Sequence, residues 1–311
     1  MKLSLVLLLL TGAMPVTREV YLMGTRSVLT AYASTRDAGQ SQLETYIRIL
    51  EETESDLSVW RTDTPLSRLN ETPVGRPFQL SPPIFKLLED GVFWWKETER
   101  AFDPGIGRLL DSRGFYGKPP AVTSTKPVFG MQHFVLDPER QRVFRDADIW
   151  IDSGAFGKGE ALDRVRRQAE IDGADPWLID LGGQVMVYGH PPEKPFWTID
   201  VAHPQKRDVA ALTLELRSGS LSTTSNSEQP GHVLDPRTGL PVEFTGSVVV
   251  WHDRGLVADI LSTALFVMGP ENGIRWANAR GIAACFLVPD GNRLEFRSTE
   301  RFRTLFNVSS N

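Results

Sequence analysis

Residues 255–268 constrain the fold of this chain more than any other segment, because they form a helical pattern that is apolar on nearly every side. Such a helix belongs inside a core rather than on a surface. Asp259 and Thr263 lie four residues apart and therefore share one face of this helix. A carboxylate buried without a partner costs several kcal/mol, so something must compensate Asp259. Two hypotheses stay open: Asp259 caps a nearby backbone turn, or it joins Thr263 as a hard-oxygen ligand of Mg²⁺.

The patterns along the rest of the chain indicate more strands than helices. We expect helices at residues 41–57, from Pro82 after a cap at Ser81, at about 158–171, at about 256–268 and from Pro270. We expect strands at residues 21–33 with a turn at 23–25, and at 177–181, 185–188, 196–201, 212–216, 246–251, 283–288 and 294–297. Many of these strands follow one another directly, which predicts an α+β fold with mixed or antiparallel sheets flanked by helices. No linker pattern divides residues 14–311, so we expect one compact, two-lobed domain.

Residues 151–163 place glycines around the start of a predicted helix. The unpaired N–H groups and the dipole of a helix N-terminus favour a phosphate group at such a position. The spacing of Gly154, Gly157 and Lys158 fits neither a Walker loop nor the dinucleotide-binding fingerprint. From these residues alone, a phosphate site and a plain tight turn are equal alternatives.

Further polar turns lie at residues 101–107, 181–183, 222–226 and 231–241. The last of them carries His232, which is either a functional group or one side of a structural hydrogen bond. The histidines are not spaced as a zinc-binding pair. A serine hydrolase is excluded, because no Gly-x-Ser-x-Gly turn is present to expose a nucleophile.

Charge and cysteine content exclude other classes. The chain has 34 basic and 39 acidic residues and a formal net charge of −5, so it lacks the electrostatic footprint of a nucleic-acid-binding protein. Its single cysteine, Cys285, excludes an intramolecular disulfide and a cysteine-based zinc site. Because Cys285 lies in the apolar run 283–288, we interpret it as a small buried hydrophobic residue rather than a nucleophile.

The N-terminal residues indicate a secretory signal. Lys2 precedes an apolar run at residues 3–10, and small residues follow up to Ala13. The run is too short to span a bilayer, and no cysteine follows it, which excludes a lipoprotein signal. We therefore expect a signal peptide at residues 1–13 and a periplasmic or otherwise exported protein, with inner-membrane association left open and the cytoplasm as the alternative. Cleavage there would start the chain near Met14, and we expect this new terminus to lie beside the turn at residues 23–25.

Taken in order, these segments resemble the ApbE family, the FAD:protein FMN transferases, over about residues 21–268. The resemblance rests on the following motifs: Met23-Gly24-Thr25; Ser58-Val59-Trp60 followed by Leu66-Ser67-Arg68-Leu69-Asn70; Ala101-Phe102-Asp103-Pro104; residues 151–163; Leu181-Gly182-Gly183; residues 232–239; and Ala258-Asp259-x-x-Ser262-Thr263-Ala264. It implies an ApbE-like, T-fold-like architecture.

The resemblance also implies roles for single residues. Mg²⁺ would be held by Asp259, Thr263 and the carbonyl of Gly157, and His232 would lie beside the pyrophosphate as a catalytic group together with Asp259. The implied flavin contacts are Met23, Trp60, Ala101, Phe102, Asp103, Gly154, Glu160 and Val233. Besides lacking the leader cysteine of the many relatives that are lipoproteins, the sequence departs from the family at two places. Glu160 stands where a tyrosine is common, and Asn226-Ser227 replaces a Gly-Asp pair.

The activity that this resemblance implies is a Mg²⁺-dependent transfer of FMN from FAD to a threonine or serine hydroxyl of an acceptor protein, with release of AMP. FAD and the acceptor protein are then its partners, and no nucleic acid is expected. Two alternatives remain: an FAD pyrophosphatase that yields FMN and AMP, and a non-catalytic FAD-binding protein.

Overall fold

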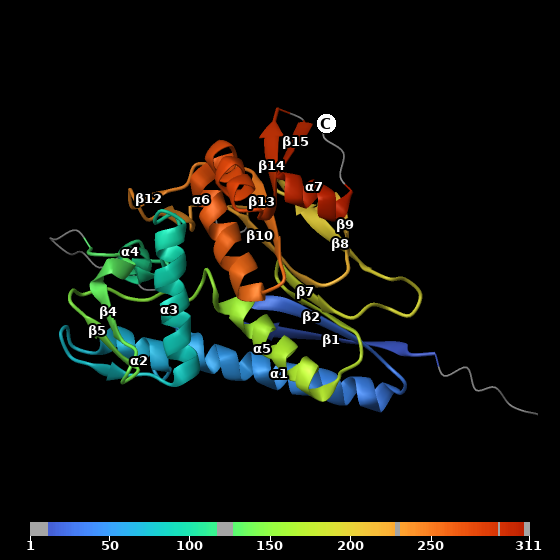
Figure 1. Cartoon of the computed structure of the whole chain (residues 1–311), viewed down its shortest axis with the longest axis horizontal. Coiled ribbons are helices and arrows are strands. Elements are labelled where there is room, and N and C mark those ends of the chain that lie inside the picture. Colours follow the sequence, from blue (N-terminus) through green and yellow to red (C-terminus); the bar gives the residue numbers. More distant parts are fainter. Residues whose placement is uncertain (1–11, 117–126, 228–230, 292, 308–311) are drawn as a thin grey trace, which may run out of the picture.

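The computed structural model describes residues 12–116, 127–227, 231–291 and 293–307. The predicted signal segment, residues 1–13, lies outside the described residues except for Gly12 and Ala13. Within the described part the elements form the α+β fold with antiparallel sheets that the sequence predicts. Figure 1 shows the large sheet on one side of helix α6 (Gly255–Ala279) and a smaller group of helices and strands on the other.

The large sheet has eight strands in the order β1-β2-β6-β7-β10-β13-β14-β15, and each neighbouring pair is antiparallel. Its strands are β1 (Met14–Leu22), β2 (Thr25–Ala33), β6 (Trp177–Leu181), β7 (Gln184–Tyr188), β10 (Gly219–Ser225), β13 (Ser247–His252), β14 (Ala283–Asp290) and β15 (Arg293–Ser298). The small sheets pair β8 (Trp197–His203) with β9 (Lys206–Leu216), β11 (Leu234–Asp235) with β12 (Leu240–Pro241), and β5 (Arg142–Arg145) with β3 (Phe78–Gln79) and β4 (Phe134–Asp137).

The helices divide between the two sides of α6. Helices α1 (Arg36–Leu57) and α5 (Gly157–Asp172) pack on each other beside the large sheet, and α6 packs on α5, β10 and β13. The smaller group holds α2 (Pro65–Glu71), α3 (Pro82–Glu97), α4 (Gly107–Ser112) and the 3-10 turns η1 (Pro104–Ile106) and η2 (Met131–His133). Helix α7 (Glu300–Phe306) packs on β14.

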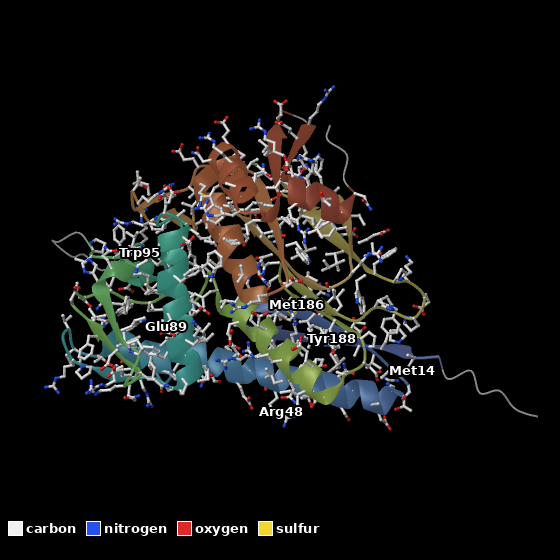
Figure 2. The ribbon with its side chains drawn as sticks, viewed as in Figure 1. Met14, Arg48, Glu89, Trp95, Met186 and Tyr188 are labelled. Atoms are coloured by element: carbon white, nitrogen blue, oxygen red, sulfur yellow. The ribbon has the colours of Figure 1, made fainter. Side chains whose placement is uncertain are left out.

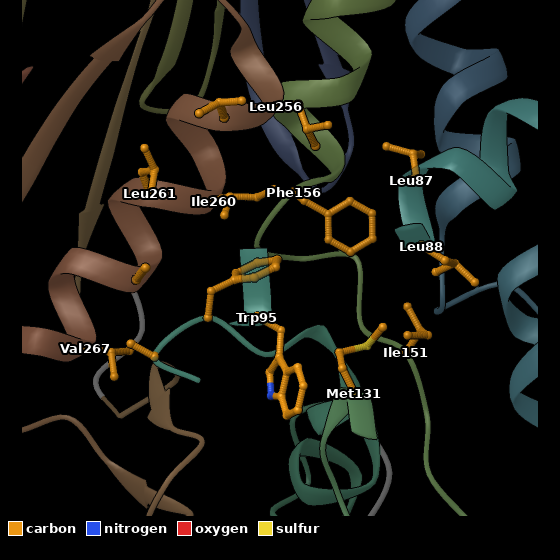
Figure 3. Packing of buried hydrophobic residues seen from close by; sticks show 14 of the residues in the cluster. Leu87, Leu88, Trp95, Met131, Ile151, Phe156, Leu256, Ile260, Leu261 and Val267 are labelled. Atoms are coloured by element: carbon orange, nitrogen blue, oxygen red, sulfur yellow. The ribbon is translucent and has the colours of Figure 1, made fainter. Parts of the chain in front are cut away.

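The first half of α6 is buried on all sides, as its apolar sequence predicts. Residues 255–262 and 264–267 are all buried. Figure 3 shows Ile260 and Val267 of α6 in the same apolar cluster as Trp95 of α3 and Phe156 at the N-terminus of α5. Helix α6 therefore joins the two halves of the protein through a shared core.

Glycine ends or interrupts two helices where the sequence predicts a stop. Gly269 leaves the helical conformation inside α6, with φ of 75° and ψ of 170°, and Pro270 starts the second helical segment there. Gly173 ends α5 in the left-handed conformation, with φ of 60° and ψ of 45°. Glycine is favoured at a left-handed position because it has no Cβ that would clash with the backbone.

One predicted helix and one predicted strand begin earlier in the chain than the sequence pattern indicates. Helix α1 begins at Arg36 rather than at residue 41, because Thr35 caps it by accepting the N–H of Ala38 at 3.2 Å. Strand β9 begins at Lys206 rather than at residue 212. Its first residues are exposed on both faces, so they lack the apolar alternation that reveals a strand.

The expectation that Met14 lies beside the turn at residues 23–25 is wrong. Residues 14–22 form strand β1, which runs antiparallel to β2 and pairs Met14 with Ala33. A nine-residue strand separates its ends by about 30 Å, and Figure 2 shows Met14 at the outer end of β1. The turn itself is a two-residue hairpin turn, with positive φ at Met23 (50°) and Gly24 (74°). The sequence conceals β1 because most of its side chains are exposed or half-buried.

Candidate functional site

Most residues singled out from the sequence line one cavity of about 570 Å³ beside α6. They come from distant parts of the chain: the loop before α2, the segment that leads into η1, the loops before α5 and β11, and α6 itself. The predicted residues in its lining are Trp60, Ala101, Phe102, Asp103, Gly154, His232, Val233, Asp259 and Thr263. A cavity of this volume suits a small molecule or a cofactor.

A second cavity of about 640 Å³ adjoins the first and contains two more predicted positions, Met23 and Gly157. The residues that line both cavities are Trp60, Asp152, Gly154, Lys158 and Gly182. Because they share this wall, the two cavities are parts of one cleft. Three of these five residues, Asp152, Gly154 and Lys158, belong to the loop before α5 and to its first turn.

A close crossing of α5 and α6 positions the floor of the first cavity. A Cβ on Gly159 would collide with the carbonyl oxygen of Gly255, and a Cβ on Gly255 would lie 2.7 Å from the carbonyl oxygen of Gly159. Only glycine allows the two backbones to approach this closely. Asp163 of α5 then accepts the N–H groups of Gly255 at 2.6 Å and Leu256 at 3.1 Å, which caps the start of α6.

Asp259 faces the same crossing from the other helix. Its Oδ2 accepts the N–H of Gly159 at 2.9 Å, and the residue also lines the first cavity. Burial raises the pKa of the Asp259 carboxyl, while the charge of Lys158, the Gly159 N–H and the Ser222 hydroxyl oppose the rise. The two hypotheses for Asp259 are therefore compatible, since one carboxylate can cap a backbone turn and still face a ligand.

The donor set around Asp259 fits a hard cation such as Mg²⁺. Thr263 lines the same cavity, and the bond from Gly159 to Asp259 holds the first turn of α5, which starts at Gly157, against this face of α6. No cluster of three or more histidine, cysteine or acidic side chains able to hold a metal occurs among the described residues. A metal here would need hydroxyl, carbonyl and substrate oxygens beside one carboxylate, which is how Mg²⁺ is commonly bound.

Glu160 does not join the other predicted residues. It lies in the first turn of α5, is buried, and lines neither cavity. Its Oε1 accepts from Arg164 and from Arg167, each at 2.9 Å, and Arg164 also binds Asp56 of α1 at 2.6 Å. The carboxylate is thus turned away from the cleft and helps to hold α5 on α1.

Asp103 shapes the turn between the cleft and η1. Its Oδ1 accepts the N–H groups of Gly105 at 2.8 Å and Met131 at 3.1 Å. Burial raises its pKa to about 6, although these two N–H groups act in the opposite direction. The side chain is therefore mainly a structural anchor that also lines the cavity.

Aromatic rings form one edge of the cleft. Trp60 is 65% exposed, and its ring meets that of Tyr116 edge-on, with centroids 5.3 Å apart. Tyr116 donates its hydroxyl hydrogen to Oδ2 of Asp152 at 2.7 Å, and burial raises the pKa of both groups. An exposed ring held by a half-buried one can pack against a planar ligand.

The turn before β11 places His232 and Val233 in the first cavity. Val233 accepts the N–H of Val242 at 2.9 Å, and Val242 in turn accepts from Nδ2 of Asn226 at 2.8 Å. Asn226, one of the two departures from the family pattern, therefore helps to anchor the turn that carries His232.

Several charged residues of the cleft lining have no role predicted from the sequence, and Lys158 and Asp180 are two of them. Asp180 ends up beside Lys158, and its carboxylate accepts the N–H of Gly183 at 3.1 Å. Burial raises the pKa of Asp180, and the Gly183 N–H and the charge of Lys158 lower it. The signal was present, because both residues adjoin predicted glycine turns, but only the fold brings those turns together.

Comparison with known proteins gives a consistent result. The model of the ApbE family matches residues 23–286. An FAD:protein FMN transferase of Klebsiella pneumoniae is 28% identical over 269 residues, covering 80% of this chain and 77% of that protein. An FAD:protein FMN transferase of Vibrio cholerae is 26% identical over 322 residues, covering 96% of each. The crystal structure of the Pseudomonas stutzeri flavinyl transferase ApbE in its apo form superposes with a TM-score of 0.83 at 26% identity, covering 96% of this chain and 98% of that one.

Proposed function

The chain belongs to the ApbE family and transfers FMN from FAD to an acceptor protein, and we propose that it does so with Mg²⁺, onto a threonine or serine hydroxyl, and with release of AMP. The observation that carries this proposal is the gathering of the predicted residues around one cleft. They come from segments as far apart as Met23 and Thr263, and the fold brings them together around a space of ligand size.

The cleft residues would bind FAD. Trp60 and Phe102 offer aromatic surface to a planar ring, and the loop at Gly154 offers close approach to backbone. The residues proposed to contact FAD are Met23, Trp60, Ala101, Phe102, Asp103, Gly154 and Val233. Glu160 is left out because its carboxylate is bound by two arginines.

Asp259, Thr263 and the carbonyl of Gly157 would hold Mg²⁺. When bound, the cation supplies positive charge to the diphosphate oxygens, on which negative charge accumulates during phosphoryl transfer. The residues contribute position: the Gly159 N–H fixes the Asp259 carboxylate, and α6 holds Thr263 one turn further on the same face.

The transfer step is a displacement at phosphorus. The acceptor oxygen forms a bond to the phosphorus of the FMN half, the bond from that phosphorus to the bridging oxygen breaks, and AMP leaves with the electron pair. The acceptor hydroxyl must lose its proton. His232 lines the cavity and is the proposed base, a role that contributes about 10²–10⁴-fold in rate.

One incubation tests this proposal. The full chain is mixed with FAD, Mg²⁺ and a candidate acceptor, and in-gel flavin fluorescence and intact mass are followed. Flavin attached to the acceptor at a hydroxyl residue, with AMP released, is the expected result. Free FMN with an unmodified acceptor would instead identify an FAD pyrophosphatase, and intact FAD would identify a binding protein.

We also propose that residues 1–13 are a signal peptide and that the protein is periplasmic or otherwise exported. Strand β1 begins at Met14, so removal of these residues would leave the pairing of β1 with β2 intact. No helix in the part of the chain that the structure describes is long and apolar enough to cross a membrane.

A further inference from the structure

Lys158 occupies the wall between the two cavities. It is the second residue of α5, and it lines both cavities. The other residues of the shared wall are Trp60, Asp152, Gly154 and Gly182. Lys158 is therefore the one positively charged side chain among the described residues that line both cavities.

The charge of Lys158 acts on the half-buried carboxylate of Asp180 and the buried carboxylate of Asp259. Burial raises the pKa of both carboxyl groups, and the positive charge of Lys158 opposes this rise in each. Within the part of the chain that the structure describes, the Lys158 ammonium nevertheless makes no hydrogen bond or ion pair. Its donors are thus near anionic groups without being committed to one of them, which suits a lysine that binds an arriving anion.

The proposed contacts of FAD place its diphosphate near this wall. Met23 lines only the second cavity, whereas Phe102 and Val233 line only the first, so an FAD molecule that reaches all three residues passes the shared wall. FAD has two ring-bearing halves joined by a diphosphate. The diphosphate would also lie at the proposed Mg²⁺ ligands, and Asp259, one of those ligands, is within the electrostatic reach of Lys158.

We propose that Lys158 binds the diphosphate of FAD, with Asp180 and Asp259 balancing its charge before the substrate arrives. This inference rests on the proposed function, because it takes FAD as the ligand. Lysine acts here as a compact point charge with three donors, so arginine at this position should keep part of the effect and a neutral side chain of similar length should lose it.

The test is ligand binding to the full chain by calorimetry, with ADP and adenosine as probes, in the presence and absence of Mg²⁺. Lys158→Met should weaken ADP binding by about tenfold or more, as expected for a lost hydrogen bond to a charged group, and change adenosine binding by less than about twofold. Lys158→Arg should keep ADP affinity within about fivefold of the wild type. Lys194→Met, at an exposed lysine remote from the cleft lining, is the matched control and should change neither.

The ratio of ADP affinity to adenosine affinity shows whether Lys158 binds the diphosphate or only supports the structure of the cleft. Equal weakening of ADP and adenosine by Lys158→Met, or unchanged ADP affinity, would overturn the proposal. If Lys158→Met does not fold, Lys158→Arg and Lys158→Gln are compared in the same way. Binding of ADP needs no acceptor and no turnover. A wild-type chain that binds ADP through Lys158 but modifies no acceptor would therefore refute the proposed function and leave this inference standing.

Discussion

Asp259 and Asp163 cap each other's helices. Asp259 of α6 accepts the N–H of Gly159 in α5, and Asp163 of α5 accepts the N–H groups of Gly255 and Leu256 in α6. The bond that orients the proposed metal-binding carboxylate is thus part of the contact that fixes the two helices. Changes at Asp259 should affect metal binding and stability together, in proportions that depend on the replacement.

Asp259→Asn should separate these two effects. The amide oxygen can still accept the Gly159 N–H, so we expect the variant to stay folded, whereas loss of the negative charge should reduce Mg²⁺-dependent transfer by about 100-fold or more. Asp259→Ala also loses the hydrogen bond and should be less stable than Asp259→Asn by about 1–3 kcal/mol. Thermal unfolding and acceptor flavinylation measure the two effects. Wild-type activity of either variant at limiting Mg²⁺ would show that Asp259 does not hold the metal.

Gly159→Ala should disturb the helix crossing itself. The added Cβ meets the backbone of Gly255, which cannot rotate away, so α5 and α6 must shift. We expect a loss of about 1–3 kcal/mol in the free energy of unfolding, with weaker FAD binding. Gly91→Ala in α3 is the control, because its Cβ would lie 3.5 Å from the nearest atom, an ordinary contact, and alanine favours helix there. Equal stability of the two variants would mean that α5 and α6 leave room for a Cβ at residue 159.

His232→Ala should reduce transfer while leaving FAD bound. If the imidazole takes the proton of the acceptor hydroxyl, its removal should slow transfer by about 10²–10⁴-fold at saturating FAD. Rates are measured by acceptor fluorescence and FAD affinity by titration. His190→Ala, at an exposed histidine outside the cleft lining, should match the wild type. Loss of FAD affinity without a separate loss in rate would give His232 a positional role instead.

Asp103→Asn should change how stability depends on pH. Burial raises the pKa of Asp103 from 3.8 to about 6, so the folded protein holds this proton more tightly than the unfolded chain does. The carboxyl therefore favours folding at low pH, and this contribution is lost as pH rises from about 4 to about 6. Relative to Asp103→Asn, the wild type should lose a few kcal/mol of stability across that range, at about 1.4 kcal/mol per pKa unit. Urea unfolding of both proteins from pH 4 to 8 measures it, and a constant difference would contradict the raised pKa.

The sequence predicts those features that depend on local pattern. The apolar circumference of residues 255–268, the helix start at Pro82 and the stop at Gly173 are each visible within one segment, and each is present in the structure. Ser81 occupies the N-cap position of α3, but its side chain makes no capping hydrogen bond. Strand β1 was missed because few of its side chains are buried, so its pairing with β2 leaves little trace in the order of apolar residues.

The candidate site could be predicted only as separate pieces. Gly159 and Asp259 are a hundred positions apart, and nothing in either segment states that one will donate to the other. The environment of Glu160 has the same origin. Arg164 and Arg167 of the same helix donate to its carboxylate. Asp56 of α1 accepts from Arg164, and this contact forms only because α1 packs on α5. Long-range packing decides which side of a helix faces the cleft, and that information is spread over the whole chain.

The protein recovered from its native host should lack about the first thirteen residues, because the small residues near Ala13 fit a signal-peptidase site. Cleavage after Ala13 removes no member of the β1–β2 register, whose first pair is Met14 with Ala33, and no proposed site residue precedes Met23.

A chain started at Met14 should therefore keep its unfolding temperature and its transfer rate. A chain started at Val20 loses most of β1, which shields Leu43 and Ile47 of α1 through the shared apolar cluster, so it should unfold at a lower temperature. Intact mass of the native protein and thermal unfolding of both truncated chains measure these outcomes. A full-length protein found in the cytoplasm would refute export and direct the search for acceptors to that compartment, while the fold and the cleft would be unaffected.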